Sequence, residues 1–229
     1  ISWKTGKLTL TGGLISTIQF NMQEKFWGYR YIMKSFQDQY KFGSSADLGI
    51  SASYKFTDWL TADAIVVNGE GYKKIQKNDG LMYGLGATLT PLKGLSMRIY
   101  YGLNETTDPT KENKQNLATF IGYKGKGFSI GSEYNLYKND GNIKGNDLYG
   151  FSAYGSVKAS KSTDIYARYD NLSSKNDWNK AKDESAIIAG LQLKLGDYVK
   201  IAPNFRMSMP KQDNAENRYM GYVSCYFGF

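Results

Sequence analysis

The chain lacks most of the side chains with which enzymes do chemistry. Among its 229 residues there is no histidine and only one cysteine, Cys225. Ser–His and Cys–His nucleophile pairs, His-ligated zinc, disulfide frameworks and thiolate metal clusters are therefore excluded. A hydrolase would have to use carboxylates such as Glu133 or Asp170, whose ordinary role is to balance nearby cations. We expect no enzyme activity and no cofactor.

Two short motifs could bind a metal ion or a phosphate. Residues 140–147 read Asp-Gly-Asn-Ile-Lys-Gly-Asn-Asp and gather oxygen ligands, but their spacing does not match an EF-hand. We interpret this segment as a polar turn. Residues 69–71, Gly-Glu-Gly, are too short for a phosphate-binding loop and are not followed by a helix.

The formal net charge of +8 could serve nucleic-acid binding, anion handling or attraction to anionic lipid headgroups. The lysines are scattered over loops, turns and both strand faces instead of forming one stripe, which argues against a nucleic-acid partner. Basic loop residues could instead contact lipid headgroups.

The composition indicates pleated strands. The chain has Tyr 19, Gly 25, Trp 4 and only Pro 4, and aromatic residues favour strands and membrane interfaces. The mean hydropathy is −0.50, and no run of about 18 apolar residues exists. A barrel remains compatible with this value, because polar and apolar residues alternate along its strands. We find no linker and expect a single domain over residues 1–229.

Alternating segments bounded by turn residues predict about a dozen strands of the length that a tilted transmembrane strand requires. We place them at residues 6–19, 46–56, 59–69, 81–90, 95–104, 115–124, 127–138, 147–158, 163–172, 184–195, 198–209 and 218–229.

The predicted connections are alternately short and long. The short ones lie at residues 57–58, 91–94, 125–126, 159–162 and 196–197. Outer-membrane barrels have short periplasmic turns and longer external loops in this order, whereas a soluble β-sandwich has no reason to keep such a rhythm. The predicted fold is therefore all-β, a transmembrane antiparallel up-and-down β-barrel.

Strand parity assigns an apolar face and a polar face to each strand. The apolar faces, which we expect to meet lipid, include residues 95, 97, 99, 101 and 103, the odd positions from 187 to 195 and from 201 to 209, and Tyr219, Val223, Cys225, Phe227 and Phe229. Pro203 has no amide donor, so we expect a local break in the ladder there.

The polar faces carry more cations than the interior acids Asp63, Glu133 and Asp170 can neutralise. A water-filled passage lined in this way favours anions. The alternative is ordinary interior salt bridging. The candidate pore-lining residues are Arg30, Lys34, Lys55, Arg98, Lys124, Arg168, Lys194, Lys200, Arg206 and Arg218.

Residues 20–45 mix bulky aromatics with charge and are too long for a simple loop. A constriction loop folded into the barrel, with a helical turn, would place Trp27, Tyr29 and Phe36 against the wall. It would turn Arg30 or Lys34 toward the passage. The alternative is an external loop that packs on its neighbours or on a partner.

Several short motifs follow one another in an order that resembles a known family. They are residues 24–30 (Glu-Lys-Phe-Trp-Gly-Tyr-Arg), 34–36, 42–49, 67–72 and 167–170 (Ala-Arg-Tyr-Asp), with the terminal Phe229. The chain resembles porin-like outer-membrane proteins of Bacteroidetes-type bacteria, in the phosphate-selective porin O and P superfamily, over nearly its whole length.

The resemblance implies a bacterial outer-membrane location, a signal peptide and further strands before Ile1, within a barrel of about sixteen strands. Because a barrel cannot leave open edges in lipid, either such strands close it or about twelve strands close on themselves. The resemblance also implies trimeric diffusion channels, some with an arginine ladder for phosphate. Only five arginines are present, so we expect a general anion preference.

The sequence therefore predicts a porin for passive ion transport and diffusion of small hydrophilic solutes, in contact with the bilayer and lipopolysaccharide. The alternative is a non-conducting accessory subunit of a larger outer-membrane complex, which would dock a partner through its aromatic surface.

Overall fold

The structure, a computed structural model, describes residues 1–76 and 80–228. These residues form one sheet of thirteen strands, each antiparallel to the next in chain order. The strands are β1 Ser2–Thr5, β2 Leu8–Ser16, β3 Ala46–Lys55, β4 Leu60–Val67, β5 Met82–Leu89, β6 Leu95–Asn104, β7 Lys114–Gly125, β8 Phe128–Lys138, β9 Leu148–Lys158, β10 Thr163–Ser174, β11 Glu184–Leu195, β12 Val199–Pro210 and β13 Arg218–Phe227.

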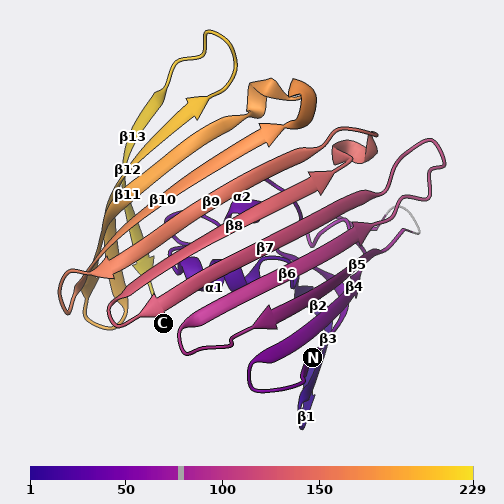
Figure 1. Cartoon of the computed structure of the whole chain (residues 1–229), viewed down its shortest axis with the longest axis horizontal. Helices are drawn as coiled ribbons and strands as arrows, with labels where there is room; N and C mark the ends of the chain where they lie inside the picture. Colours follow the sequence, from indigo (N-terminus) through magenta and orange to yellow (C-terminus); the bar gives the residue numbers. More distant parts are fainter. Residues whose placement is uncertain (77–79, 229) are drawn as a thin grey trace.

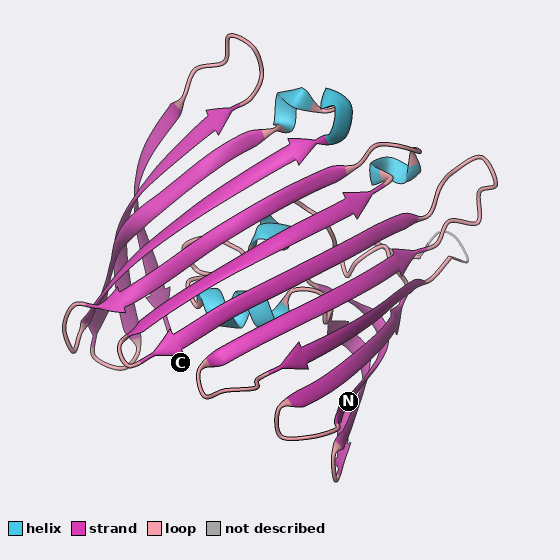
Figure 2. Ribbon diagram, in the orientation of Figure 1, coloured by secondary structure: helices cyan, strands magenta, loops and turns pink. Residues whose placement is uncertain are grey.

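The sheet curves into a deep trough, with β1 and β13 at its two edges (Figure 1). Two short helices, α1 Asn21–Trp27 and α2 Phe36–Gln39, lie on the concave side, inside the curve (Figure 2). They belong to the connection between β2 and β3, residues 17–45, which we call the inserted segment. None of the helices among the described residues is long and apolar enough to cross a membrane.

The connections alternate in length, as predicted. Short turns follow β1, β3, β5, β7, β9 and β11, and the longer connections lie at the opposite end of the sheet. Three 3-10 turns, η1 Asp140–Asn142, η2 Lys175–Asp177 and η3 Lys180–Lys182, lie in two of the longer connections. The segment that gathers oxygen ligands is thus a polar turn in the loop between β8 and β9.

The strand count differs from the prediction at the start of the chain. The predicted strand at residues 6–19 contains β2, but β1 was not predicted; it forms a hairpin with β2 that turns at Gly6 and Lys7. With thirteen strands that reverse direction at every step, β1 and β13 run the same way, so direct pairing of the two edges would be parallel. The described strands therefore do not close on themselves as an antiparallel barrel.

The predicted apolar faces lie on the convex surface. The odd-numbered residues named above in β6, β11 and β12 are all exposed or half-buried, and their even-numbered neighbours Tyr100, Ile188 and Ala202 are buried on the concave side. The predicted lipid-facing position Phe229 lies outside the described residues. Convex residues such as Leu85, Ile99, Ile130 and Val223 leave more than half of their surface exposed, so the outer face is strongly apolar.

Pro203 interrupts the sheet locally, as expected. The register between β11 and β12 runs through Gly190 opposite Asn204 and resumes at Leu193 opposite Ile201, without the two intervening pairs. The pairing of β12 with β13 is continuous across Pro203. The missing amide therefore affects only the β11 side of the strand.

Candidate functional site

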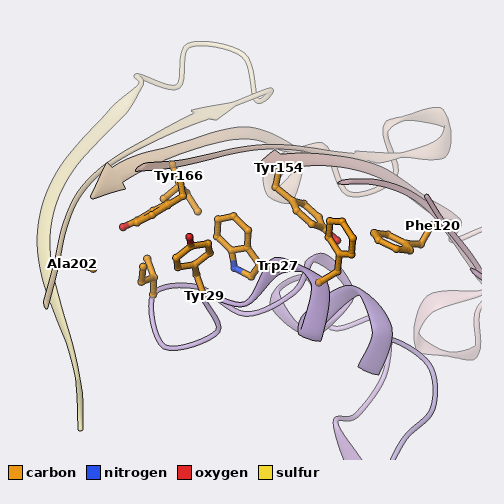
Figure 3. Close-up of a cluster of buried hydrophobic side chains, with 9 residues drawn as sticks. Trp27, Tyr29, Phe120, Tyr154, Tyr166 and Ala202 are labelled. Atoms are coloured by element: carbon orange, nitrogen blue, oxygen red, sulfur yellow. The ribbon is translucent and has the colours of Figure 1, made fainter. Parts of the chain in front are cut away.

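Aromatic side chains fix the first half of the inserted segment to the wall. Phe26 and Trp27 of α1 and Tyr29 after it are buried, and they meet Phe120, Tyr154 and Tyr166 of the concave face (Figure 3). Trp27 packs edge-on against Tyr154, with ring centroids 5.4 Å apart, and Tyr29 lies 4.6 Å from Tyr166. Edge-on and tilted aromatic pairs of this kind are favourable beyond the area they bury.

The second half packs through α2. Phe36 is completely buried, and its ring contacts Phe42, which stacks on Tyr137 of β8. Gly150 of β9 makes room for this packing, because a Cβ at that position would overlap the Phe36 ring. Trp27, Tyr29 and Phe36 therefore lie against the wall as the sequence predicted.

Three wall arginines donate hydrogen bonds to backbone carbonyls of the inserted segment. Arg98 of β6 binds the carbonyl of Ile18 at 2.9 Å, Arg206 of β12 that of Ile32 at 2.8 Å, and Arg168 of β10 that of Lys34 at 2.6 Å. Charged donors make the stronger hydrogen bonds in proteins. The arginines thus anchor the segment near its entry and at two points between α1 and α2.

Each anchoring arginine is itself held in place. Arg98 forms a two-pronged ion pair with Asp63 of β4, with both N–O distances 2.8 Å. Arg206 donates to Asn204 at 2.9 Å and lies over the Tyr222 ring. Arg168 pairs with Asp170 and is fully buried. Arg168 therefore lines no open space in the described part of the chain, because the inserted segment covers it.

Buried amides add a second set of contacts under α2. Gln37 donates to Asn135 of β8 at 2.7 Å and accepts hydrogen bonds from Gln19 and Asn116. Asn116 also donates to the Phe42 carbonyl at 2.9 Å. Because buried amides are costly to leave unpaired, this network fixes where α2 lies on the wall.

The two cations predicted within the segment pair with acids of the same segment. Arg30 contacts Glu24 and Asp38, and Lys34 binds Asp38 at 3.1 Å. Burial opposes the charge on Arg30, but hydrogen bonds to Asp38 and the nearby carboxylates outweigh it and raise the pKa of Arg30. Both side chains remain partly exposed, 43% for Arg30 and 52% for Lys34, so they still reach solvent.

A hollow of about 690 Å³ opens between the inserted segment and the wall at the end of the long loops. We call it the loop-end hollow. Its cations are Lys34, Lys41, Lys73, Lys74 and Lys114, and its acids are Asp38, Asp47 and Glu70. Asp47 also shapes the hollow, since it accepts hydrogen bonds from the Gly69 and Gly71 amides at 2.8 and 3.0 Å.

Two smaller hollows, of about 470 and 380 Å³, lie on the other side of the segment, toward the short turns. We call them the turn-end hollows. Their cations are Lys25, Arg98, Lys124, Lys158, Lys194 and Lys200, and their acids are Asp63 and Asp164. Lys194 pairs with Asp164 at 2.9 Å, while Lys124 and Lys200 lie over aromatic rings. Cations therefore outnumber acids on both sides of the segment.

The remaining candidates lie near the two rims. Lys55 is on the concave face at the end of β3 and binds Asp58 of the following short turn at 2.7 Å. This hydrogen bond lowers the pKa of Asp58. Arg218, at the opposite end, is exposed and lies 4.0 Å from Glu184.

Sequence reasoning missed the lysines that complete the hollows. Lys114 and Lys158 lie on the concave face at strand ends and are two residues from Asn116 and Ser156, so strand parity could have found them. Lys41, Lys73 and Lys74 lie in connections, where no alternation indicates which way a side chain points.

Known structures resemble this chain over almost its whole length, although no family model and no curated protein sequence matches it. OprB of Pseudomonas putida superposes with a TM-score of 0.77 at 11% identity, over 98% of this chain and 70% of that chain. Outer-membrane OmpT of Vibrio cholerae gives 0.70 at 16% identity, over 98% and 78%.

A mutant porin from Rh. blastica gives a TM-score of 0.63 at 12% identity, over 98% of this chain and 75% of that chain. At these identities the likeness concerns the fold. The antiparallel strand order and the apolar convex face agree with this likeness of fold. The chain has the fold of the β-barrel proteins of the bacterial outer membrane, among which are porins. The outer membrane is the location expected from its sequence.

Proposed function

We propose that the protein is an outer-membrane porin through which small hydrophilic solutes diffuse passively, with a preference for anions. One observation carries the proposal: the inserted segment is anchored inside the trough and cation-rich hollows lie on both sides of it. A solute that follows the concave face would pass from one hollow to the other along the segment.

The excess of cations supplies the anion preference. Six cations face two acids in the turn-end hollows, and five face three in the loop-end hollow. A concave, partly desolvated site focuses the field of such charges and concentrates counter-ions, and rings of lysine and arginine favour anions in other pores. Arg98, Arg168 and Arg206 contribute mainly by holding the segment.

The surroundings of the protein follow from its two faces. The apolar convex surface would contact lipid, and the long loops, on the external side, would contact lipopolysaccharide. We further propose that residues 1–229 act as one domain, that the inserted segment is the constriction, and that the ten candidate residues line or shape the passage. From the resemblance, we also propose that the protein forms a homotrimer. We propose further that it comes from a Bacteroidetes-type bacterium and belongs to the porin O and P superfamily.

Bilayer recordings test the function. Reversal potentials under a salt gradient would be measured for the wild type and for a variant with Lys124, Lys158 and Lys200 replaced by glutamine. A matched control replaces Lys93, Lys144 and Lys161 by glutamine. These lysines lie in turns and loops outside the hollows, and their replacement changes the net charge by the same amount.

We expect stepwise, anion-selective conductance in the wild type, reduced selectivity in the first variant and little change in the control. Equal effects of the two variants would reject the hollows as the source of selectivity. A correctly inserted but silent protein would reject the porin proposal in favour of the accessory subunit.

A further inference from the structure

Glu133 lies in the middle of the seam between the inserted segment and the wall. It is on the concave face of β8, between Gly131, which faces the ring of Phe26 in α1, and Asn135, which binds Gln37 in α2. Its exposed fraction is 2%. The carboxyl group therefore lies beneath the inserted segment, midway between the two helices.

The hydrogen bonds of this carboxyl group are incomplete. Glu133 Oε2 accepts a hydrogen bond from Asn135 Nδ2 at 3.2 Å, whereas Oε1 is buried without a partner among the described residues. Within the described structure, Ser152, its cross-strand neighbour on β9, has an unpartnered Oγ, and the fully buried Gln23 of α1 has both amide atoms unpartnered. A protonated Glu133 would have a hydrogen to donate to an acceptor such as the Ser152 hydroxyl oxygen.

The buried charges do not balance if Glu133 is ionised. Arg168 is the only buried cation facing it in the described structure, and its Nε and Nη2 are taken by Asp170. The third nitrogen, Nη1, donates to the Lys34 carbonyl. One guanidinium would thus face two carboxylates, and an unpaired buried carboxylate is strongly disfavoured.

Among the described residues, no other charge that faces Glu133 compensates. The charged and titratable groups that face Glu133 are Arg168 and Asp170 of β10 and Tyr154 of β9. Its partner on β7 is Phe120. The charged residues of the two helices are engaged elsewhere, since Glu24 and Asp38 contact Arg30 and Lys25 is exposed. The local group of Glu133, Arg168 and Asp170 is electrically neutral only when Glu133 carries a proton.

We propose that Glu133 is a proton-dependent anchor of the inserted segment: it is neutral while the segment is seated, and its ionisation accompanies release of the segment from the wall. The proposal about seating stands on the contacts above; only its effect on conductance rests on the proposed function. A segment that leaves the wall would alter the passage, so the opening would depend on pH.

The direction of the pH effect follows from proton linkage. The seated state binds one proton more than the released state, in which water can solvate the carboxylate. Seating is therefore favoured at low pH and weakens as the pH rises, by at most about tenfold in the seating equilibrium per pH unit for a single proton. A released segment becomes more abundant under alkaline conditions.

Hydrogen–deuterium exchange of the full chain in lipid vesicles tests this directly. The exchange rates of peptides covering residues 21–39 would be compared in the wild type, Glu133→Gln and the control Glu112→Gln between pH 6 and pH 9. Because these peptides have the same sequence in all three proteins, the ratio of rates at one pH reports the ratio of opening equilibria.

We expect the ratio of wild-type to Glu133→Gln rates to increase with pH by several-fold, within the limit of about tenfold per unit. Glu112→Gln should match the wild type, since its carboxyl is in an outer loop beside Lys144. A ratio that stays constant over this range would overturn the proposal, because exchange in Glu133→Gln would then rise with pH as steeply as in the wild type.

A wild-type measurement covers the case in which Glu133→Gln does not insert. Chemical exchange alone rises about tenfold per pH unit, and a linked proton adds up to the same factor again. Exchange within residues 21–39 should therefore rise more steeply than the chemical rate, and a slope equal to the chemical rate would overturn the proposal. Conductance recorded on the same samples tests the porin function separately, so the two proposals can fail independently.

Discussion

Arg168 and Asp170, two residues apart on β10, form a two-pronged ion pair with N–O distances of 2.8 and 2.7 Å beneath the inserted segment. Both side chains point to the concave face because residues i and i+2 share one side of a strand. The pair leaves Arg168 Nη1 to bind the Lys34 carbonyl. A neutralised guanidinium thus serves as a fixed attachment point for the segment.

Removing this arginine should destabilise the protein strongly. Arg168→Met leaves Asp170 buried without its partner, and breaking a buried ion pair in this way costs about 3–5 kcal/mol. Urea unfolding from lipid vesicles would measure the loss of free energy. The double variant Arg168→Met, Asp170→Asn should recover a good part of the loss, because it also removes the stranded carboxylate. A double variant no more stable than the single one would contradict the ion-pair explanation.

Gly150 should not tolerate a side chain while Phe36 is present. Gly150→Ala places a methyl group in the space of the Phe36 ring, and overpacking of this kind costs about 1–3 kcal/mol. We expect weaker protection of α2 in hydrogen exchange and a lower unfolding midpoint. Combining it with Phe36→Leu should cost less than the sum of the two single changes. Simple additivity would mean that the two positions do not compete for space.

Anion selectivity should decline as salt is added. Charges act over a Debye length of about 10 Å at 0.1 M salt and about 3 Å at 1 M, so lysines that line an aqueous hollow are screened progressively. Permeability ratios from reversal potentials in increasing KCl gradients should approach the ratio of bulk mobilities. Selectivity that is constant across this range would indicate direct dehydration contacts instead of a field from the lysines.

Asp108, in the connection between β6 and β7, should stay ionised at pH values where an ordinary aspartate is already partly protonated. The Thr110 hydroxyl, the Thr110 amide and Lys111 donate to its carboxylate and lower the pKa of Asp108 to about 2. Because the pKa is depressed in the folded state, the stabilising effect is present above the ordinary carboxyl range and is lost as the pH falls toward 2.

Carbon-13 NMR of labelled aspartate would follow this titration, with Asp108→Asn to assign the signal. Thr110→Ala removes the hydroxyl donor and should move the midpoint upward, while the backbone amide and Lys111 keep it below that of a free aspartate. A midpoint unchanged by Thr110→Ala would show that the hydroxyl contributes nothing.

Periodicity explains how much of the fold was predictable. An alternation of period two fixes both the strand and its face, so Tyr100, Arg168 and Asn204 could be placed on the concave side from sequence alone. β1 was missed because it has only four residues, Ser2–Thr5, too few for alternation to identify a strand.

The partners of these side chains could not be predicted in the same way. Arg98 reaches across β5 to Asp63 because Gly86 leaves the space open, and such a contact depends on strand order and register together. Strand parity predicted that the arginines point inward. The sequence contains no signal for their hydrogen bonds to carbonyls of the inserted segment, because every residue offers the same backbone acceptor.

The hydrogen bonds from the wall arginines to backbone carbonyls leave the side chains at these positions free to vary in sequence. At Ile18, Ile32 and Lys34 the wall arginines donate hydrogen bonds to backbone carbonyls, so these hydrogen bonds do not depend on which side chain stands there. Related proteins could exchange Lys34 for an acid or a neutral residue and retain the same attachment. An engineer could change the charge of the loop-end hollow in the same way and leave the scaffold as it is.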